Sequence, residues 1–550
     1  MRVSSPGVGP SDETGSLHVE GREVPVTASD TIASAMVAAG ELGNRRDDRG
    51  DLRGLWCGMG VCHECAVTVD HREGALACVT PARAGQIVET QSAKRRVPVA
   101  GESPRPESEL APDVLVIGAG PAGLAAARDL AASGLDVIVV DERKKLGGQF
   151  YKQPDPAFAL DEARLDGQYT AGRRLIDAAR QAGVRILLGV TVWAAFDADR
   201  LLARSDAERW ILTPRRVVLA TGAYERGVPI PGWTLPGVMT TGAGQTLLRS
   251  YQVAPGARVL IAGNGPLNIQ LAAELASAGV DVVGLVEAAP FLSPTRGAAA
   301  LRMGLDAPGL TRDGVVYLAA LARKRVPILP GSIVESLEGD PQRGVRRATV
   351  ARVDREGRAT GRRRVFEVDA VCLGYGFLPG NDLARSLGAA HEYDHARGAL
   401  RTVTDETGRT SVETVWAIGD SAGVRGAKYA QAEGAVAAAA IIADLAGRPA
   451  VADARLARTA RRHLAFQRGV NALFAAPVLT DQLARPDTVV CRCEGVTHGD
   501  LVEAMTDGVS SPGAVKRVTR AGMGKCQGRY CGPVLTDMEA RRRGEQIGRA

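Results

Sequence analysis

Eight of the nine cysteines stand in two compact groups, one toward each end of the 550-residue chain. The first group consists of Cys57, Cys62, Cys65 and Cys78. Its C-x4-C-x2-C spacing, followed by a more distant fourth cysteine, is the plant-type arrangement that holds a [2Fe–2S] cluster through four thiolates. Gly58 and Gly60 would let the loop wrap tightly and turn backbone N–H groups toward the sulfurs. The group therefore predicts a [2Fe–2S] cluster, with a zinc ion as the alternative.

The second group lies near the C-terminus and consists of Cys491, Cys493, Cys526 and Cys531. Two short helical patterns, "HGDLVEAMTDG" and "SPGAVKRVTRAG", separate its C-x-C and C-x4-C pairs and would bring them together. This arrangement resembles the small helical [2Fe–2S] domain of the bacterioferritin-associated ferredoxin (BFD) type, and zinc is again the alternative. The ninth cysteine, Cys372, sits in the apolar run "DAVCLGYG", and we interpret it as a buried core thiol.

The segments before the first cysteine group predict the elements that position it. "SLHVEGREVPV" is typical of a β-hairpin, and "SDTIASAMVAAG" is typical of a helix capped by Ser29 or Asp30. This order is similar to the β-grasp fold of small ferredoxins, so we expect the first cysteine group to lie in a ferredoxin-like domain.

The middle of the chain contains a dinucleotide-binding unit. An apolar strand, Val114 to Ile117, leads into a glycine loop and a helix, and a second apolar strand ends in a charged triplet. The loop glycines are Gly118, Gly120 and Gly123, and the triplet is Asp141, Glu142 and Arg143. Such glycines make the turn, admit the pyrophosphate and allow close helix packing, while the acid suits ribose hydroxyls. The triplet would suit the adenosine ribose of FAD, NAD or ATP.

Three further segments favour FAD. "LGGQ", "VLATGAYE" and "VWAIGDSAG" look like motifs of flavoproteins with two dinucleotide-binding domains. Their candidate cofactor-binding residues are Gly148, Gln149, Thr221, Gly222, Gly419 and Asp420. The resemblance implies that Asp420 contacts the ribityl or phosphate region of the flavin. Two one-electron clusters also need a flavin, which converts a two-electron transfer into single electrons.

A second unit, "ARVLIAGNGPLNIQLAAELASAGVDVVGLVE", is inserted between these segments. It has Gly263 and Gly265, but Asn268 stands in place of the third glycine, and Glu287 closes the second strand. In flavoprotein reductases this position binds NAD(P)H; here the asparagine makes NAD binding doubtful. Residues 226–370 contain no cysteine, so the redox pair of a disulfide reductase is missing.

The bulk properties limit the function classes. The net charge of +6, from 68 basic and 62 acidic residues, gives no reason to expect a nucleic-acid partner. No apolar run is long enough for a transmembrane segment, and the first residues lack the apolar core of a signal peptide. We expect a cytoplasmic chain, which is either free in the cytoplasm or bound peripherally at the inner face of the membrane.

The predicted fold is α/β: a flavoprotein with two dinucleotide-binding domains, an N-terminal β-grasp [2Fe–2S] domain and a C-terminal small helical BFD-like [2Fe–2S] domain. The boundaries we expect are 1–95 for the ferredoxin-like domain, 96–112 for a linker, 113–228 with 371–450 for the FAD-binding domain, 229–370 for the inserted NAD-binding-like domain, 451–485 for connecting helices and 486–550 for the BFD-like domain.

This order of domains, with "PGWTLPGVMTTGAGQTLL", resembles the α subunits of heteromeric FAD/iron–sulfur amine and amino-acid dehydrogenases. That group includes hydrogen cyanide synthase, opine oxidases, and D-hydroxyproline and proline dehydrogenases, with the α chain of sarcosine oxidase a more distant relative. The resemblance implies that the substrate is oxidised on an FAD-dependent, D-amino-acid-oxidase-like β subunit, and that this chain passes electrons to an acceptor protein or quinone.

Three hypotheses follow. The first is an electron-transferring α subunit of a dehydrogenase acting on proline, hydroxyproline, an opine, glycine or sarcosine. It agrees with the lack of a convincing constellation to bind and deprotonate a substrate, which leaves the catalytic residues unknown. The second is a self-contained NAD(P)H-dependent reductase, which needs a working site at Gly263, Gly265 and Glu287. The third is a non-enzymatic scaffold with structural or redox-sensing groups.

Overall fold

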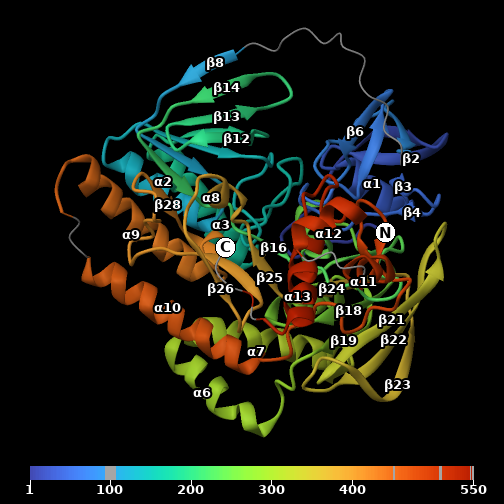
Figure 1. Cartoon of the computed structure of the whole chain (residues 1–550). Coiled ribbons are helices and arrows are strands. Elements are labelled where there is room, and N and C mark those ends of the chain that lie inside the picture. The colour runs from blue at the N-terminus through green and yellow to red at the C-terminus, as the bar shows by residue number, and fades with distance from the viewer. Residues whose placement is uncertain (93–106, 450–452, 507–510, 546, 548–550) are drawn as a thin grey trace.

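The computed structural model describes residues 1–92, 107–449, 453–506, 511–545 and 547 as an α/β protein. The N-terminal domain, blue in Figure 1, lies beside the red C-terminal domain, and both contact the domain built from the middle of the chain. The two cysteine groups, at opposite ends of the sequence, therefore belong to neighbouring domains in space.

The N-terminal domain is a mixed sheet crossed by one helix. Its elements are β1 (Glu13–Val19), β2 (Arg22–Thr27), α1 (Ile32–Ala39), β3 (Arg45–Arg46), β4 (Leu52–Arg53), β5 (Ala66–Val69), β6 (Arg72–Leu76) and β7 (Ile87–Thr90). The sheet order is β2-β1-β7-β5-β6, with β1 and β7 parallel and the other pairs antiparallel. This is the β-grasp arrangement, and the β1–β2 hairpin is the one that the sequence predicts.

The cap of helix α1 differs from the prediction. Thr31, and not Ser29 or Asp30, is the N-cap residue, and its hydroxyl accepts a hydrogen bond from the backbone N–H of Ser34. Asp30 is not free for that role, because its carboxylate accepts hydrogen bonds from Thr27 and pairs with Arg2.

The first dinucleotide-binding domain is a parallel five-stranded sheet with helices packed against it. Its elements are β9 (Val114–Ile117), α2 (Pro121–Ala132), β10 (Val137–Asp141), α3 (Gly167–Gln181), β11 (Arg185–Leu188), β15 (Arg216–Leu219), β28 (Val415–Ala417), η2 (Gly419–Ser421) and α9 (Ala427–Leu445). The sheet order is β11-β10-β9-β15-β28. The Ala-rich helix α9 packs on α2, as expected for a buried helix.

A second sheet of this domain and a small peripheral unit flank it. The second sheet contains β8 (Glu107–Leu110), β12 (Thr191–Asp197), β13 (Arg200–Arg204) and β14 (Arg209–Leu212), and the peripheral unit contains α8 (Asp382–Ser386), β26 (His391–Asp394) and β27 (Ala399–Thr402). Strand β8 pairs with β14, so the end of the predicted linker belongs to this sheet. Residues 96–106 of that linker lie outside the described residues.

The inserted domain repeats the dinucleotide-binding pattern. Its elements are β17 (Val238–Thr240), α4 (Thr241–Tyr251), β18 (Arg258–Gly263), α5 (Pro266–Ser277), β19 (Asp281–Glu287), η1 (Pro294–Arg296), α6 (Gly297–Asp306), α7 (Pro308–Arg323), β20 (Ile328–Pro330), β21 (Ser332–Asp340), β22 (Gly344–Val353), β23 (Ala359–Glu367) and β24 (Ala370–Gly374). Strands β16 (Ala223–Glu225) and β25 (Phe377–Pro379) pair where the chain crosses between the domains.

The return to the first domain comes later than predicted. Strand β24 pairs with β17 and β18, inside the parallel sheet β17-β24-β18-β19-β20. The inserted domain therefore extends to Gly374, and the predicted boundary at residue 371 would cut through one of its central strands. Apolar character alone marked this strand as buried, without indicating which of the two sheets it joins.

One helix, α10 (Ala454–Leu473), connects the flavoprotein part to the C-terminal domain, where the sequence predicted several. The C-terminal domain contains β29 (Val489–Cys491), β30 (Val496–Thr497), α11 (His498–Thr506), α12 (Pro512–Thr519) and α13 (Cys531–Arg543). Helices α11 and α12 are the two predicted between the cysteine pairs, and they contact each other. Residues 451 and 452 of the predicted connection are outside the described residues.

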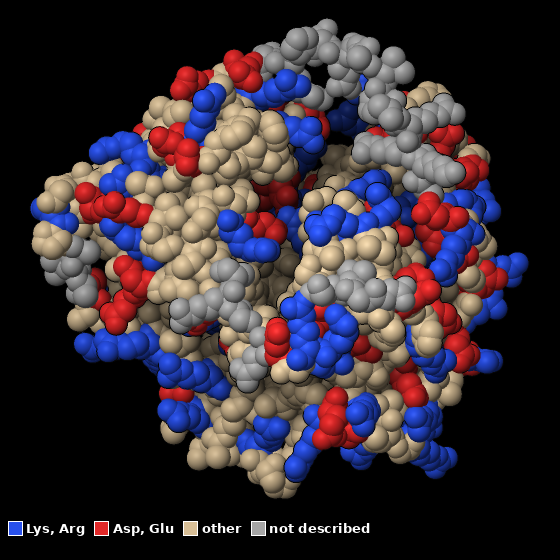
Figure 2. All heavy atoms as spheres, viewed as in Figure 1, with Lys and Arg blue, Asp and Glu red and all other residues tan. Residues whose placement is uncertain are grey.

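The surface shows no segregation of charge on the face seen in Figure 2, where Lys and Arg side chains are interspersed with Asp and Glu. Within the described ranges, no helix combines the length and the apolar character needed to cross a bilayer.

Candidate functional site

The glycine loop of the first domain follows strand β9 and is tightly packed. Gly118 has a positive φ of 110°, and a Cβ there would lie 2.3 Å from the Ala220 carbonyl oxygen. A Cβ on Gly123 would lie 1.9 Å from the carbonyl oxygen of Gly118. Gly120 instead borders open space, with Gly148 Cα its nearest neighbour at 3.8 Å from a built Cβ. Two of the glycines are thus required by packing, and the third leaves room for a phosphate.

The two acids of the charged triplet, Asp141 and Glu142, have different surroundings. Asp141 accepts hydrogen bonds from the backbone N–H of Ala119 and of Arg143, each at 2.8 Å. Its carboxylate braces the glycine loop through both of its oxygens. Glu142 faces the open cavity beside the loop, where its side chain is exposed. The protein that surrounds the cavity, and then the neighbouring Asp141, raise its pKa. Glu142 is therefore the candidate acid for ribose hydroxyls.

The two later motifs meet the glycine loop at the ends of strands β15 and β28. The Thr221 hydroxyl donates a hydrogen bond to the Gly380 carbonyl, and Gly222 has a positive φ of 69°. Asp420 accepts hydrogen bonds from the backbone N–H groups of Arg425 at 2.8 Å and Gly426 at 3.1 Å. Asp420 thereby shapes the turn into helix α9, whose N-terminus points at the same space.

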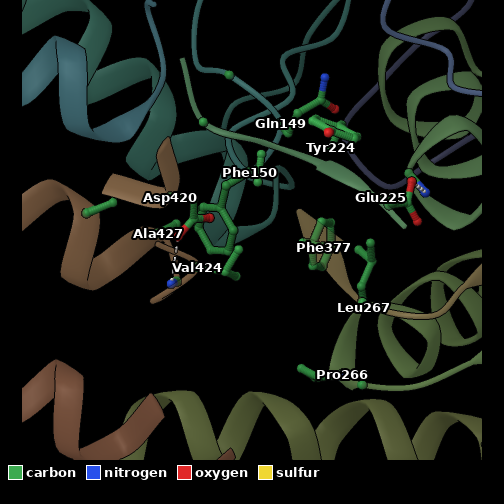
Figure 3. A pocket seen from close by; sticks show the side chains of 18 of the residues that line it. Gln149, Phe150, Tyr224, Glu225, Pro266, Leu267, Phe377, Asp420, Val424 and Ala427 are labelled. Carbon is green, nitrogen blue, oxygen red and sulfur yellow. Dashed lines mark hydrogen bonds between the residues drawn. The ribbon is translucent and has the colours of Figure 1, made fainter. Parts of the chain in front are cut away.

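These residues border one cavity of about 1610 Å³ that runs between the two dinucleotide-binding domains. Figure 3 shows Gln149 beside Tyr224 on one wall, Asp420 and Val424 on a second wall, and Pro266 at the start of α5. The predicted residues on the wall are Gly118, Gly120, Asp141, Glu142, Arg143, Gly148, Gln149, Thr221, Gly222 and Asp420. Gly123 and Gly419 lie behind it, where they allow α2 and α9 to pack.

The cavity fits a flavin dinucleotide. It extends from the glycine loop to the crossing strands β16 and β25, and its wall combines apolar surface with a few polar groups. The side-chain nitrogen of Gln149 is buried in the wall, with no hydrogen-bond acceptor among the described residues. A donor left unpaired in this way suits an acceptor atom of a bound ring.

Two buried polar residues in the wall were not predicted from the sequence. Lys152 donates a hydrogen bond to Gln245 at 2.9 Å, and burial lowers the pKa of its amine to about 7. Glu225 accepts a hydrogen bond from the backbone N–H of Gly242 at 2.8 Å, and burial raises its pKa to about 7. Lys152 lies just after the motif "LGGQ", in "GGQFYKQP", and Glu225 ends the motif "VLATGAYE". The sequence of these segments does not indicate that the Lys152 and Glu225 side chains point into the cavity wall.

The inserted domain repeats this loop with one acid fewer. In the register of β18 with β19, Gly263 is opposite Glu287, and Glu287 accepts hydrogen bonds from the backbone N–H groups of Gly265 and Ala289, each at 2.9 Å. Glu287 is therefore the counterpart of Asp141, which braces its own loop. The counterpart of Glu142 is Ala288, which has no carboxylate for a ribose.

Asn268 explains how this loop packs without a third glycine. Its side chain is 1% exposed, accepts a hydrogen bond from the Thr241 hydroxyl at 2.7 Å and donates one to the Gly374 carbonyl at 3.0 Å. It thus joins α5 to the ends of β17 and β24. The loop residue Asn264 donates to the Phe474 carbonyl at 2.9 Å, so the chain after α10 closes over the loop.

Glu287 predicts a measurable dependence of stability on pH. Burial raises its pKa from 4.5 to about 7, so between these values the folded chain holds a proton that the unfolded chain has released. Folding is then less favourable as the pH rises through that window, by roughly 3 kcal/mol for a shift of this size. We expect Glu287→Gln, which cannot ionise, to show a smaller fall in Tm between pH 5 and 8 than the unmodified chain. The exposed Glu356→Gln is the control, and equal slopes for all three proteins would contradict the assignment.

The first cysteine group has the geometry of a cluster loop. All four cysteines are buried, and Gly58, Gly60 and His63 have positive φ values that curl the loop. Cys62 and three backbone N–H groups donate hydrogen bonds to the Cys57 sulfur; they outweigh burial and lower the pKa of this thiol to about 7. The loop rests on the start of α4, since a Cβ on Gly58 would lie 2.9 Å from Ala243 Cα. These N–H donors favour thiolate ligands.

The second group converges in the same way. Cys491 is hydrogen-bonded to Cys531 and Cys493 to Cys526, which joins the two pairs across α11 and α12. The hydrogen bond from Cys493, with backbone N–H groups of residues 528–530, lowers the pKa of Cys526 to about 6. Among the side chains that the structure describes, none form a compact group of three suited to a single metal ion.

Cys372 is a core residue, as predicted. Its side chain is fully buried in β24, and burial raises the pKa of its thiol far above the usual range. It is the only cysteine of residues 113–450, so the flavoprotein part lacks a redox pair.

Comparison with known families agrees with this architecture. Residues 112–439 match the model for pyridine nucleotide-disulphide oxidoreductases, residues 13–93 the 2Fe-2S iron-sulfur cluster binding domain, and residues 489–538 the BFD-like [2Fe-2S] binding domain. The fold and site therefore define a two-dinucleotide-domain flavoprotein with two [2Fe–2S] domains, and its cofactors are FAD and two [2Fe–2S] clusters.

The relatives narrow this class to one group. The chain is 37% identical over 432 residues to the HcnB subunit of hydrogen cyanide synthase from Pseudomonas aeruginosa, covering 76% of this chain and 90% of that protein. It is 33% identical over 441 residues to an opine oxidase subunit from Agrobacterium tumefaciens, covering 78% of this chain and 85% of that protein. The chain belongs to the family of these subunits, which confirms the resemblance found in the sequence.

More distant similarities follow the same pattern. The alpha subunit of sarcosine oxidase from a Corynebacterium species is 29% identical over 395 residues, covering 67% of this chain and 38% of that protein. The crystal structure of L-proline dehydrogenase from P. horikoshii shares the fold, with a TM-score of 0.68, 19% identity and coverage of 98% of this chain and 94% of that chain.

Proposed function

We propose that this chain is the electron-transferring α subunit of a heteromeric flavin/iron–sulfur dehydrogenase that acts on an amine or amino acid. The main observation behind this proposal is that the flavin cavity is bordered by three residues of the first cysteine loop, Cys57, Met59 and Gly60. A flavin in that cavity would lie beside the first cluster, and the second cysteine domain packs against the first. The chain is thus built as one continuous electron path.

The substrate would be oxidised elsewhere. We place the loss of two electrons from a substrate such as proline, hydroxyproline, an opine, glycine or sarcosine on a partner flavoprotein that is similar to D-amino-acid oxidases. The names of the related subunits support a heteromeric complex, because each is one subunit of an oxidase or synthase. Electrons leaving the clusters would reach an acceptor protein or a quinone.

The residues proposed to hold FAD follow from the cavity. Gly118 and Gly120 with the start of α2 would receive the pyrophosphate, Glu142 the adenosine ribose, and Asp420 with the start of α9 the ribityl or phosphate region. The ring would lie toward Gln149 and the crossing strands. The flavin supplies the exchange between two-electron and one-electron transfer, and this chain's residues orient it and exclude water.

A self-contained NAD(P)H reductase is the competing function, and the inserted domain argues against it. Glu287 already accepts a hydrogen bond from the backbone N–H of Gly265 in the loop, and Ala288 stands where a ribose-binding acid would be. Asn264 of the loop donates a hydrogen bond to the Phe474 carbonyl. We therefore expect no productive NADH site there. A cytoplasmic location, or a peripheral one at the inner face of the membrane, is part of the proposal and fits eight cysteines kept as cluster ligands.

The test is anaerobic visible spectroscopy on the chain alone and on the complex co-purified with its natural neighbours. We expect the isolated chain to keep its flavin band when NADH is added. We expect the complex to bleach with proline, hydroxyproline, an opine, glycine or sarcosine, and to ignore NADH. Bleaching of the lone chain by NADH would instead establish the reductase.

A further inference from the structure

The two cysteine loops are joined by a buried ion pair. Glu64 lies between Cys62 and Cys65 and is 1% exposed, while Arg492 lies between Cys491 and Cys493 and is 4% exposed. Arg492 donates a hydrogen bond to Glu64 at 3.0 Å. A charged residue inside each cluster loop therefore reaches the other loop, across 428 residues of sequence.

The ion pair belongs to a small buried network. Arg45 also pairs with Glu64, and its guanidinium donates a hydrogen bond to the backbone carbonyl of Arg492 at 3.0 Å. Arg492 donates a second hydrogen bond, to the Trp233 carbonyl at 2.8 Å. Two arginines thus surround one carboxylate, so the network carries one net positive charge between the loops.

Aromatic rings enclose this charge. The Arg492 guanidinium lies over Trp56 at 4.4 Å and over Trp233 at 4.7 Å, and the two rings meet edge to face at 5.2 Å. Trp56 precedes Cys57, and Tyr530, which precedes Cys531, lies 6.2 Å from Trp56. Tyr224 of the cavity wall lies 5.8 Å from Tyr530. The arginine sits where the two loops and the cavity wall converge.

Three donors at this junction are left without partners. Arg492 Nε, Trp56 Nε1 and the Tyr530 hydroxyl are buried, and no acceptor contacts them among the described residues. Each belongs to a residue directly beside a cluster cysteine. Sulfur ligands are acceptors for such donors, and hydrogen bonds and nearby charge are what set the potential of a cluster.

We propose that Arg492 is a positioning residue shared by both clusters: it fixes the two cysteine loops against each other and favours the reduced state of both. The proposal rests on the assignment of the two clusters and is independent of the substrate. A buried positive charge stabilises the extra negative charge of a reduced cluster, and the low dielectric of this junction lets it act on the far cluster as well as on its own.

The test is a redox titration of the isolated chain followed by electron paramagnetic resonance. Single-cluster variants, Cys57→Ala and Cys531→Ala, assign the two signals. We expect Arg492→Met to make both clusters harder to reduce, by at least tenfold in the ratio of reduced to oxidised protein, which is 59 mV for one electron. Arg492→Lys, which keeps the charge, restores most of that shift. Glu64 retains Arg45 as a partner in both variants.

Arg249→Met is the matched control. Arg249 is 3% exposed and pairs with Glu274 and Asp166, each at 2.8 Å, and not with a residue of either cysteine loop. Its loss therefore removes an equally buried charge and should leave both potentials unchanged. If Arg492→Met does not fold, Glu64→Gln provides the same test from the other loop and should make both clusters easier to reduce. The proposal is overturned if a variant shifts only the cluster of its own loop, or neither cluster.

Discussion

Replacing Gly123 by alanine is expected to produce a chain that loses its flavin and keeps both iron–sulfur clusters. The new Cβ would lie 1.9 Å from the Gly118 carbonyl oxygen, so helix α2 must move away from strand β9. That movement displaces the helix N-terminus and the loop that receive the pyrophosphate. Overpacking of this kind costs about 1–3 kcal/mol, which corresponds to roughly 5- to 150-fold weaker FAD retention. Flavin content after gel filtration, with cluster absorbance as the internal reference, measures the effect.

Gly304→Ala is the matched control for this change. Gly304 is also in a helix, α6, but nothing lies within 4 Å of a Cβ built there. The substitution should keep the flavin and stabilise the helix slightly, since alanine is favoured over glycine in helix interiors. Equal flavin content in the Gly123 and Gly304 variants would contradict the assignment of the first glycine loop as the FAD site.

Replacing Cys57 by alanine is expected to remove the N-terminal cluster and to interrupt the electron path. Cys57 is fully buried, borders the flavin cavity and receives several hydrogen bonds. Iron and acid-labile sulfide should fall to about half, because each [2Fe–2S] cluster needs its four thiolates. In the complex, amine should still bleach flavin while reduction of the external acceptor falls to the background rate.

Cys372→Ala is the control for the loss of a buried thiol. Cys372 is as buried as Cys57 but lies within the core of the inserted domain, where a Cβ on Gly244 would come within 2.8 Å of its sulfur. This variant should keep the iron content and both resonance signals. Acceptor reduction that survives in Cys57→Ala would show that electrons leave the flavin by a route that avoids the N-terminal cluster.

The sequence was most informative where chemistry demands a fixed spacing. The cysteine groups and the glycine loop of residues 118–123 require their residues at set positions, so their roles could be predicted before the fold was known. The β1–β2 hairpin was predicted from its local sequence pattern. The capping residue of α1 was missed because Thr27, Ser29, Asp30 and Thr31 are all good caps, and tertiary contacts decided among them.

Long-range contacts could not be predicted from the sequence. Nothing in the pattern of the triplet indicates that Asp141 braces the loop while Glu142 faces the cavity; only the backbone geometry separates them. The same holds for Glu64 and Arg492. A charged residue inside each cysteine loop was visible, yet their pairing depends on two terminal domains meeting in space. The division at Gly374 was missed because β24 returns to the centre of a sheet begun more than a hundred residues earlier.

The central claim is that electrons from an amine enter this chain through a flavin and reach both clusters. The most direct measurement is electron paramagnetic resonance of the co-purified complex, frozen after anaerobic addition of the amine that bleaches it, with NADH in a parallel sample. We predict that the amine produces the signals of both reduced clusters and that NADH produces neither. Signals that appear with NADH, or amine bleaching without any cluster signal, would contradict the account.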